Sequence, residues 1–336
     1  MNSLPKISGV ISTRDRPKDL AELLITILNQ SHPPYEVIII DDSHDSSAKD
    51  VVNSFDPQFV SVGCKLKYVK GSGDGLPSAR NLGVNASRGE AVLFLDDDTL
   101  LDDNVINALA TFLRDEPTAL GVQPKILSSP KNRIYSGLAT KSKNAIFKVF
   151  MLTYREKNKL GVRRSGASVL HDDLTKVISA QRLSGCCCCY RREVFSKLSF
   201  DTSLKRWGFM EDLDFSYRLH KIRPQSLYAI PYAKTIHKLS EEARLPTKTL
   251  THMKTTYFLY VFFKDIFESS MLNLVALLLA LMGNIVIVIG GLIAKRKPKN
   301  RWRELIYLIN SYFYVFRHLR EIFRRDLGFF NVQIKE

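Results

Sequence analysis

Three consecutive carboxylates, Asp96, Asp97 and Asp98, follow an apolar run in the stretch EAVLFLDDDTLL, residues 90–101. Three ionised side chains in a row repel one another, so this arrangement calls for a positively charged partner. Asp96 and Asp98 would point to the same side of a strand or turn, and Asp97 to the other. Carboxylates at this spacing suit Mg²⁺ or Mn²⁺, which need few protein ligands when phosphates supply the rest. The spacing alone leaves a solvated acidic loop as the alternative.

Further polar residues stand at the ends of other predicted strands. Thr13 and Arg14 follow the apolar run that begins at Ile7, and Asp41 and Asp42 follow the run VIII. In a parallel sheet the carboxyl ends of the strands lie along one edge, where ligands bind. We therefore expect these side chains and the three aspartates to face one cleft.

Strand and helix patterns alternate through the first 125 residues. The apolar spacings predict, in order, strand 7–13, helix 17–30, strand 35–43, strand 64–70, helix 76–87, strand 90–98 and helix 102–116. This order predicts an α/β fold with a parallel, doubly wound sheet. Farther along we expect loops over about 126–180, a strand running into a helix over 181–198, a helix over 209–222 and a strand over 226–238.

The charge of the chain indicates an anionic partner. The formal net charge is +15 and the pI is about 9.5, which suits nucleic acid, an anionic membrane surface or a phosphorylated ligand. The lysines and arginines are spread along the chain without an aromatic nucleic-acid motif. We therefore expect no nucleic-acid partner.

Four of the five cysteines stand in a row, from Cys186 to Cys189. Neighbours on a strand point to opposite faces, so this run does not easily close around one zinc ion. We expect reduced, mostly buried thiols in a cytosolic compartment, with palmitoylation as the alternative.

Five ordered pieces of the sequence resemble the family 2 glycosyltransferases, over roughly residues 7–240. The pieces are VISTRDRPKDL (10–20), VIIIDDS (37–43), GLPSARNLGVNASRGEAVLFLDDD (75–98), LSGCCCCYRREVF (183–195) and GFMEDLDFSYRLHK (208–221). The resemblance implies the GT-A nucleotide-sugar-binding fold, a mainly parallel sheet with flanking helices. The run of cysteines after LSG departs from the small residues that the family usually has there.

The resemblance also implies where a nucleoside-diphosphate sugar would bind. Asp41 or Asp42 would hold the base or ribose, and Thr13 and Arg14 would line the same pocket. Arg80, in the ARN of the third piece, would approach the base or diphosphate, with a helix-surface arginine as the alternative.

The resemblance gives the three aspartates and a histidine roles in metal and donor binding. Asp96 and Asp98 would hold Mg²⁺ or Mn²⁺ together with the sugar nucleotide, to which Asp97 would also contribute. His237 would add a metal or diphosphate contact, with a structural histidine as the alternative.

Glu211 and Asp212 match the acidic pair that the family carries at a helix start, where the Asp is the general base. Such a base takes the proton of an acceptor hydroxyl while the oxygen attacks the anomeric carbon, and the configuration inverts. Favourable interaction of acids with a helix N-terminus is the alternative. A phosphate acceptor is already ionised, so Asp212 would then serve more to position it.

A long apolar segment marks the C-terminal part. Residues 271–293 carry no charge and are long enough to cross a bilayer, with a buried core helix as the alternative. We expect no secretory signal in the first 15 residues. Residues 295–336 carry eleven Lys or Arg against four Asp or Glu. With a cytosolic catalytic domain, a single span would place this basic tail outside, against the usual orientation. A bend at 282–284 would instead give a re-entrant hairpin, with 302–319 as an interfacial helix.

These observations together predict a membrane-bound glycosyltransferase. We expect a GT-A catalytic domain over 1–245 on the cytoplasmic side of the cell membrane and a membrane-associated helical region over 246–336. The acceptor would be lipid-linked, such as a polyprenyl or dolichyl phosphate or a lipid-linked oligosaccharide. One alternative is a non-catalytic, basic, membrane-associated scaffold that binds sugar nucleotides. The other is a haloacid-dehalogenase-like phosphatase, but its motif has Thr or Val two positions after the second Asp, where this chain has Leu100.

Overall fold

The computed structural model describes residues 3–128, 138–240, 246–293 and 298–332. The chain divides into two compact units. Unit 1 comprises residues 1–134 and 173–243, and unit 2 comprises residues 135–172 and 244–336.

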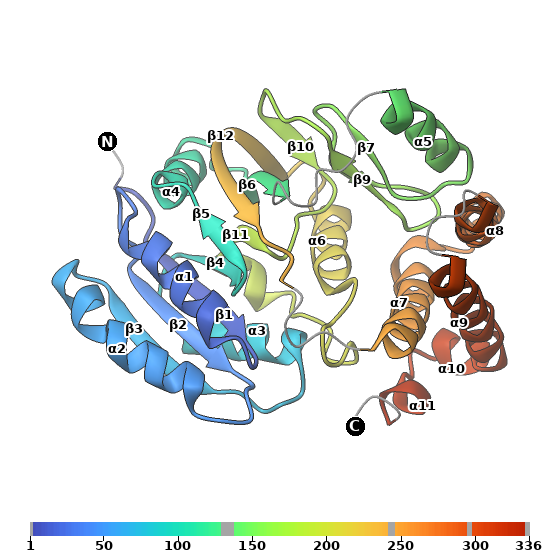
Figure 1. The fold of residues 1–336 in the computed structure, drawn as a ribbon. Helices are drawn as coiled ribbons and strands as arrows, with labels where there is room; N and C mark the ends of the chain where they lie inside the picture. The colour runs from blue at the N-terminus through green and yellow to red at the C-terminus, as the bar shows by residue number, and fades with distance from the viewer. Residues whose placement is uncertain (1–2, 129–137, 241–245, 294–297, 333–336) are drawn as a thin grey trace. The chain divides into compact units, whose positions relative to one another are not determined.

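Unit 1 is built around a mixed sheet (Figure 1). Its strand order is β10-β12-β6-β11-β4-β1-β2-β3, and β5 pairs with β12. Strands β3, β2, β1 and β4 are parallel, as the sequence predicts, whereas β11 is antiparallel to both β4 and β6. The strands are β1 (Ile7–Thr13), β2 (Glu36–Asp41), β3 (Lys65–Lys70), β4 (Ala91–Asp96), β5 (Thr99–Leu101), β6 (Gly121–Ser128), β10 (Ile178–Ala180), β11 (Cys187–Arg191) and β12 (Leu227–His237).

Helices cover the sheet of unit 1. They are α1 (Pro17–Leu28), α2 (Ser47–Ser61), α3 (Leu76–Ala86), α4 (Val105–Asp115) and α6 (Glu211–Ile222). The helix predicted after the cysteine strand is a short 3₁₀ helix, Arg192–Ser196. Helix α2 was missed by the sequence reasoning, because its mostly polar sequence buries only Ala48, Val52 and Phe59.

The two faces of the sheet have different cores. On one face, buried side chains of α1, α2 and α4 pack with alternate strand residues such as Ile11 and Ile39. The other face holds aromatic rings, with Phe94 of β4 in edge contact with Phe200, which stacks on Phe215 of α6. Helix α3 approaches β1 so closely that a Cβ at Gly83 would lie 2.2 Å from Val10 Cγ1. This packing fixes α3 and α6 beside the end of β4.

The cysteine run lies in the core of unit 1. Cys186–Cys189 and Cys64 are buried and free of disulfides, and burial raises the pKa of Cys187 and Cys188 well above its ordinary value. The prediction that these cysteines are mostly buried is confirmed.

Unit 2 combines a small sheet with helices. Its sheet has the strand order β7-β9-β8. Its elements are α5 (Leu138–Val149), β7 (Tyr154–Glu156), β8 (Gly161–Val162), β9 (Ser168–His171), α7 (Thr247–Val261), a π-helical turn (Phe262–Ile266), α8 (Met271–Ile293), α9 (Pro298–Arg317), α10 (Leu319–Phe323) and α11 (Gly328–Asn331).

The loops expected over the residues of unit 2 were wrong. Residues 138–149 form helix α5, and residues 154–171 contain short strands. Strands of two to four residues are too short to show a period in sequence. Part of the predicted loop, 129–137, lies outside the described residues. The sequence leaves open a single span or a hairpin bent at 282–284; helix α8 continues without a break through these residues, so the bend is not formed. A glycine and an asparagine inside a long apolar helix lower its propensity without ending it.

Candidate active site

The strand register of unit 1 brings the predicted polar residues to one edge of the sheet. Thr13 of β1 pairs with Asp41 of β2, and Ser12 pairs with Asp96 of β4. Strand β12 returns along the sheet to pair its last residue, His237, with Thr99 of β5. The end of β4 and the end of β12 therefore meet, although nearly 140 residues separate them in sequence.

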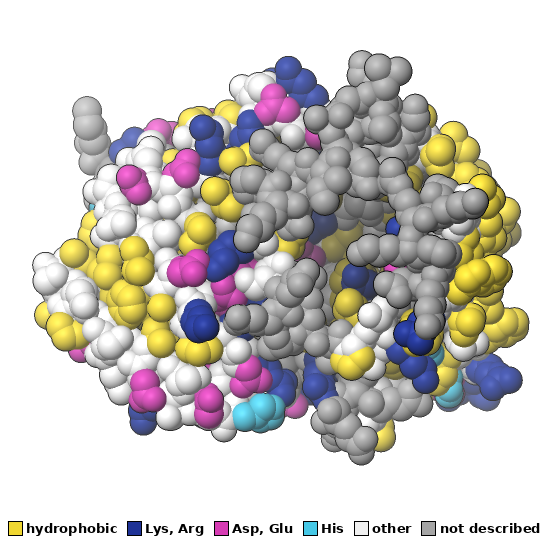
Figure 2. Space-filling view, in the orientation of Figure 1, with side chains coloured by type: hydrophobic (Ala, Val, Ile, Leu, Met, Phe, Trp, Pro, Cys, Tyr) yellow, Lys and Arg dark blue, Asp and Glu magenta, His cyan; other side chains and the backbone are white. Residues whose placement is uncertain are grey.

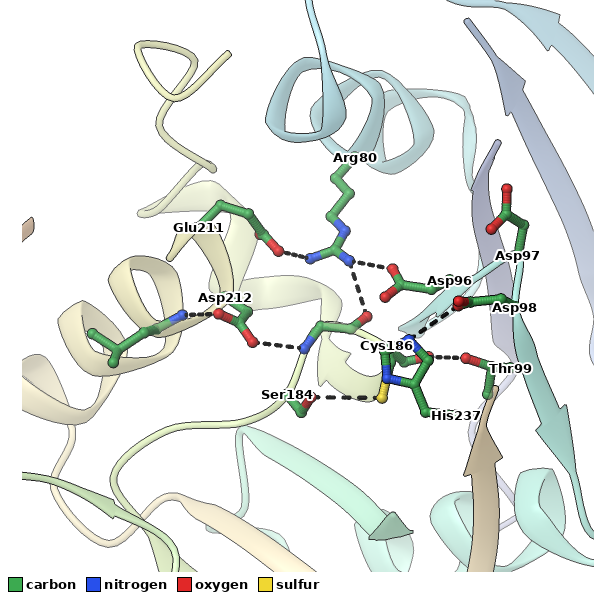
Figure 3. A network of polar contacts seen from close by, with 12 residues as sticks. Arg80, Asp96, Asp97, Asp98, Thr99, Ser184, Cys186, Glu211, Asp212 and His237 are labelled. Carbon is green, nitrogen blue, oxygen red and sulfur yellow. Dashed lines mark hydrogen bonds and ion pairs between the residues drawn. The ribbon is translucent and has the colours of Figure 1, made fainter. Parts of the chain in front are cut away.

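Asp96, Asp98 and His237 form one group of candidate ligands. One ligand atom from each lies within 4.8 Å of the others, and His237 Nε2 lies 3.0 Å from Asp98 Oδ1. Asp97 points away from them (Figure 3). Its carboxylate accepts hydrogen bonds from Thr13 Oγ1 at 2.8 Å and from Arg16 Nη1 at 3.1 Å. The alternation expected from the sequence therefore holds for the three aspartates.

Electrostatics keep Asp98 and His237 charged. Burial raises the pKa of Asp98, but hydrogen bonds from His237 and the Ser240 amide lower it overall below its ordinary value. Burial lowers the pKa of His237, but the hydrogen bond to Asp98 and nearby Cys186 and Asp96 raise it to about 11. The imidazolium therefore supplies positive charge to the carboxylates beside it.

Arg80 is a buried link rather than a helix-surface arginine. It donates to Glu211 Oε1 at 2.5 Å, to Asp96 Oδ1 at 2.9 Å and to the Gly185 carbonyl at 2.9 Å. Burial lowers the pKa of Arg80, but the two carboxylates raise it well above its ordinary value. The guanidinium therefore stays charged and ties the start of α6 to the end of β4.

The acidic pair at the start of α6 has two different environments. Glu211 is 4% exposed, and burial raises its pKa against the opposing charge of Arg80. Asp212 Oδ2 accepts from Arg182 Nη2 at 2.5 Å and from the Gly185 amide at 3.1 Å, and Oδ1 accepts from the Leu213 amide at 2.7 Å. Both oxygens of Asp212 are thus held in a fixed orientation.

The side chains of Arg80 and Glu211 pack directly against the backbone of Gly185. A Cβ there would lie 2.6 Å from Arg80 Nη1 and 2.9 Å from Glu211 Oε1. Any side chain at this position would displace the buried ion pair. The glycine of LSG is therefore required for the network in Figure 3 to form.

The acids at the end of β2 form a separate group. Asp41 accepts from Tyr68 Oη at 2.8 Å and from the Ser43 amide at 2.8 Å. Asp42 accepts from the Gly73 amide at 2.9 Å, and Arg14 Nη2 lies 3.0 Å from His44 Nε2. These contacts hold the loop residues that follow β1, β2 and β3 together.

Sequence reasoning missed Arg16, Arg182 and Gly185 as site residues. Arg16 stacks over Trp207, with its guanidinium carbon 4.7 Å from the ring centre, and pairs with Asp97. All three stand inside the quoted pieces or directly before one. An excess of carboxylates in those pieces was the available signal that buried arginines must accompany them.

Residues 8–199, more than half of the chain, match the glycosyl transferase family 2. The chain belongs to this family. Family membership favours the glycosyltransferase interpretation over the phosphatase and over the scaffold.

Named relatives from bacteria match shorter segments of this glycosyltransferase family member. The poly(ribitol-phosphate) beta-glucosyltransferase of Bacillus spizizenii is 30% identical over 103 residues, which are 30% of this chain and 16% of the relative. The poly(ribitol-phosphate) beta-N-acetylglucosaminyltransferase TarP of Staphylococcus aureus is 28% identical over 173 residues, 47% of this chain and 52% of the relative. The chain thus spans at most about half the length of these two proteins.

Solved structures share the fold. A mannosyltransferase from Pyrobaculum calidifontis, solved with GDP-Man and Mn²⁺, has a TM-score of 0.55 at 17% identity and covers 92% of this chain and 86% of its own. Residues 1–349 of S. aureus TarS have a TM-score of 0.53 at 16% identity, over 91% and 80% of the two chains. The GT-A-like fold predicted from the sequence is confirmed.

The candidate ligands are compatible with a divalent cation. Two carboxylates and one imidazole converge within 4.8 Å, and Mg²⁺ and Mn²⁺ accept carboxylate oxygens with an occasional histidine nitrogen. Asp96 retains solvent access, with 28% of its side chain exposed. A histidine binds a metal only as the neutral imidazole, so His237 would lose its proton when a cation binds. The group can then hold a cation and leave room for ligands that the protein does not supply.

Proposed function

We propose that the chain is a metal-dependent, inverting glycosyltransferase that takes a sugar from a nucleoside-diphosphate sugar. Family membership supports the reaction class. The observation that carries the site assignment is the convergence of Asp96, Asp98 and His237 beside the network that holds Asp212. Residues 1–245 would form the catalytic domain and residues 246–336 the membrane-associated region.

Asp96, Asp98 and His237 would hold Mg²⁺ or Mn²⁺. When bound, the cation would supply positive charge that stabilises the departing nucleoside diphosphate. Asp41 or Asp42, with Thr13 and Arg14, would bind the base and ribose, and Asp97 would orient this part of the site through Thr13. Arg80 would contribute to the diphosphate region by holding Asp96 in place.

Asp212 would act as the general base. As the acceptor oxygen bonds to the anomeric carbon, the bond from that carbon to the diphosphate oxygen breaks, and the acceptor proton passes to Asp212. Arg182 and the Gly185 amide keep the carboxylate oriented, and Glu211 fixes Arg80 from the adjacent position.

We propose a lipid-linked acceptor at the cytoplasmic side of the cell membrane, and an association with anionic lipid. Within the described residues, α8 has the length and composition to cross a membrane, which is a weak indication because core helices share both. The relatives named for poly(ribitol phosphate) make a polyol phosphate polymer the second acceptor class to examine.

A donor and acceptor screen tests this function. Purified full chain would be mixed with UDP-, GDP- and dTDP-sugars, Mn²⁺ or Mg²⁺, and either polyprenyl phosphate or poly(ribitol phosphate). We expect nucleoside diphosphate release and a glycosylated polyprenyl product with one donor. Glycosylation of the polyol polymer alone would overturn the lipid-linked acceptor. Absence of transfer from every donor would overturn the activity.

The variant Asp212→Asn separates chemistry from binding. It keeps the acceptor atom for the Gly185 amide but removes the base, so transfer to a hydroxyl acceptor should fall by about 10²–10³-fold while donor affinity stays within about threefold. Donor affinity is measured by calorimetry with the nucleoside diphosphate. With a phosphate acceptor the loss should be smaller, because no proton needs to be removed.

A further inference from the structure

Helices α8 and α9 of unit 2 form an antiparallel hairpin. Tyr312 Oη donates to the Leu281 carbonyl at 3.1 Å. At the other end of the pair, a Cβ at Gly291 would lie 3.1 Å from Arg301 Nε. Residues that come later in α8 contact residues that come earlier in α9, so the two helices run in opposite directions. The two helices therefore lie side by side from Leu281 to Gly291 of α8 and from Arg301 to Tyr312 of α9.

Each helix of this hairpin exposes an apolar stripe. The exposed residues recur every three or four positions, which places them on one side of each helix. They are Met271, Val275, Leu278, Met282, Val286, Ile289 and Ile293 on α8, with Leu272 also exposed beside Met271, and Trp302, Ile306, Ile309, Phe313 and Phe316 on α9. Figure 2 shows hydrophobic side chains gathered over these two helices.

The opposite side of each helix is buried. Ala276, Leu277 and Ala280 are at most 2% exposed on α8. On α9, Ser311 is buried and its Oγ lies 2.9 Å from Thr255 Oγ1 of α7. The exposed stripes are therefore not the faces that pack within unit 2.

The packing of α9 argues against α8 as a membrane span. If α8 crossed a bilayer with α9 along it, α9 would have to cross too. Only residues 305–316 of α9, between Glu304 and Arg317, lack a charge, and about 12 helical residues cover about 18 Å of a hydrocarbon core about 30 Å thick. Residues 295–303, which include the first turns of α9, carry six Lys or Arg and would lie at the far surface or inside the core.

We propose that α8 and α9 lie together in the plane of a single membrane leaflet that contains anionic lipid, with their exposed stripes in the acyl boundary, and that α8 does not cross the membrane. This inference rests on the proposed membrane association. It keeps both ends of the hairpin on one side of the bilayer, as the basic tail requires. Helix α9 carries aromatic and basic residues, as amphipathic helices that bind membranes in this orientation do; α8 would join it through its exposed apolar side.

Charge selects an anionic leaflet over a second copy of the chain. Residues 295–336 carry eleven Lys or Arg against four Asp or Glu. The exposed ones that the structure describes include Arg303 and Arg317, near the ends of the stripe on α9, and Arg320 and Arg324, in and directly after α10. Two such surfaces would repel each other, whereas an anionic surface attracts them.

Depth measurements test the in-plane orientation. The full chain would carry Met271→Cys, Met282→Cys or Ile293→Cys, each labelled with an environment-sensitive fluorophore, on vesicles of phosphatidylcholine and phosphatidylglycerol. The native cysteines are buried, so the unsubstituted chain is the labelling blank. We expect shallow nitroxide-lipid quenching at all three sites and access to external dithionite at all three. A deep site at 282 with a protected site at 293 would overturn the proposal in favour of a span.

Flotation with the same vesicles tests the stripes. Leu278→Glu and Phe313→Glu should each weaken binding about tenfold or more, because each removes one large apolar contact with the lipid. Val60→Glu, at an exposed apolar residue of unit 1, is the matched control and should bind as the unsubstituted chain does. Equal loss in the control would overturn the proposal. So would a dimer in solution that the stripe variants convert to monomers without any vesicle binding.

Turnover with detergent-dispersed acceptor distinguishes this inference from the proposed function. Normal transfer without vesicle binding would overturn only the membrane orientation. Vesicle binding at the expected depth without transfer from any donor would overturn only the function.

Discussion

Unit 1 buries acidic side chains at both ends of the parallel strands of its main sheet, and the surroundings of these acids differ. We call the side where the parallel strands begin the amino edge and the side where they end the carboxyl edge. At the amino edge, Glu36 is 1% exposed and accepts from Ser8 Oγ at 2.8 Å, from the Arg88 amide at 2.5 Å and from Lys67. One carboxylate there is surrounded by its donors. It has no other acid beside it in these contacts, so its role is to join the starts of β1, β2 and β3.

At the carboxyl edge several acids share few cations. Asp96 and Glu211 both pair with Arg80. Asp98 pairs with His237 and with Arg16, which also pairs with Asp97. Ligand atoms converge there instead of being separated by donors. Burial of an acid thus says little about function, whereas convergence of several acids with one open to solvent indicates a cation site.

The largest expected effect comes from the converging group. Asp98→Asn should lower glycosyl transfer by about 10³-fold, since it removes a charge from the proposed cation site. The melting temperature should fall, because the contacts with His237, the Ser240 amide and Arg16 favour the ionised carboxylate of Asp98 in the folded state. Initial rates at saturating Mn²⁺ and calorimetric melting check both. The control is Asp103→Asn, which changes an exposed acid beyond β5 and should keep normal activity. Activity retained in Asp98→Asn would show that the converging acids do not form the cation site.

The amino edge should show the reverse result. Glu36→Gln should lower the free energy of unfolding by about 1–3 kcal/mol, since buried donors lose a charged acceptor. Transfer per folded molecule should stay unchanged. Urea titration measures the stability, and Glu90→Gln, which changes an exposed acid at the same edge, should have almost no effect. A catalytic defect in folded Glu36→Gln would mean that the two edges are coupled.

A smaller effect is expected at the end of β2. Asp42→Ala should weaken nucleoside-diphosphate binding about tenfold, which corresponds to one polar contact, and leave the rate at saturating donor nearly unchanged. Titration calorimetry and the split between KM and kcat check this. A loss in kcat alone would place Asp42 with the converging group rather than with the nucleotide contacts.

The smallest effect is the pH dependence of stability from Glu36. Burial raises the pKa of Glu36, but its hydrogen bonds from Lys67, Ser8 and the Arg88 amide lower it overall below the ordinary 4.5. The ionised form therefore stabilises the fold above about pH 4.5, and this contribution is lost as the pH falls through the folded pKa. Urea titrations from pH 6 to 3 should show a shallower decline in Glu36→Gln than in the parent. Parallel curves would contradict the assignment.

The sequence predicted the parallel half of the sheet because β1, β2 and β4 are buried on both faces and read as apolar runs. It predicted the candidate ligands of β4 for the same reason, since strand alternation separates Asp97 from its neighbours. It missed α2, whose buried residues are few, and the strands of residues 154–173, which are too short to show alternation.

Local sequence by itself determined most helices and strands of unit 1, the position of the acids at strand ends and the apolar character of α8, because each depends on side chains a few residues apart. Only the tertiary structure decided that His237 meets Asp98, that Arg80 joins Asp96 to Glu211 and that α9 lies along α8. The first two contacts join residues that lie far apart in the sequence. In the hairpin of α8 and α9 the helices are close in sequence, but packing decides which side of each helix faces the other. No local pattern specifies such pairings, because they are fixed by which surfaces the whole chain buries.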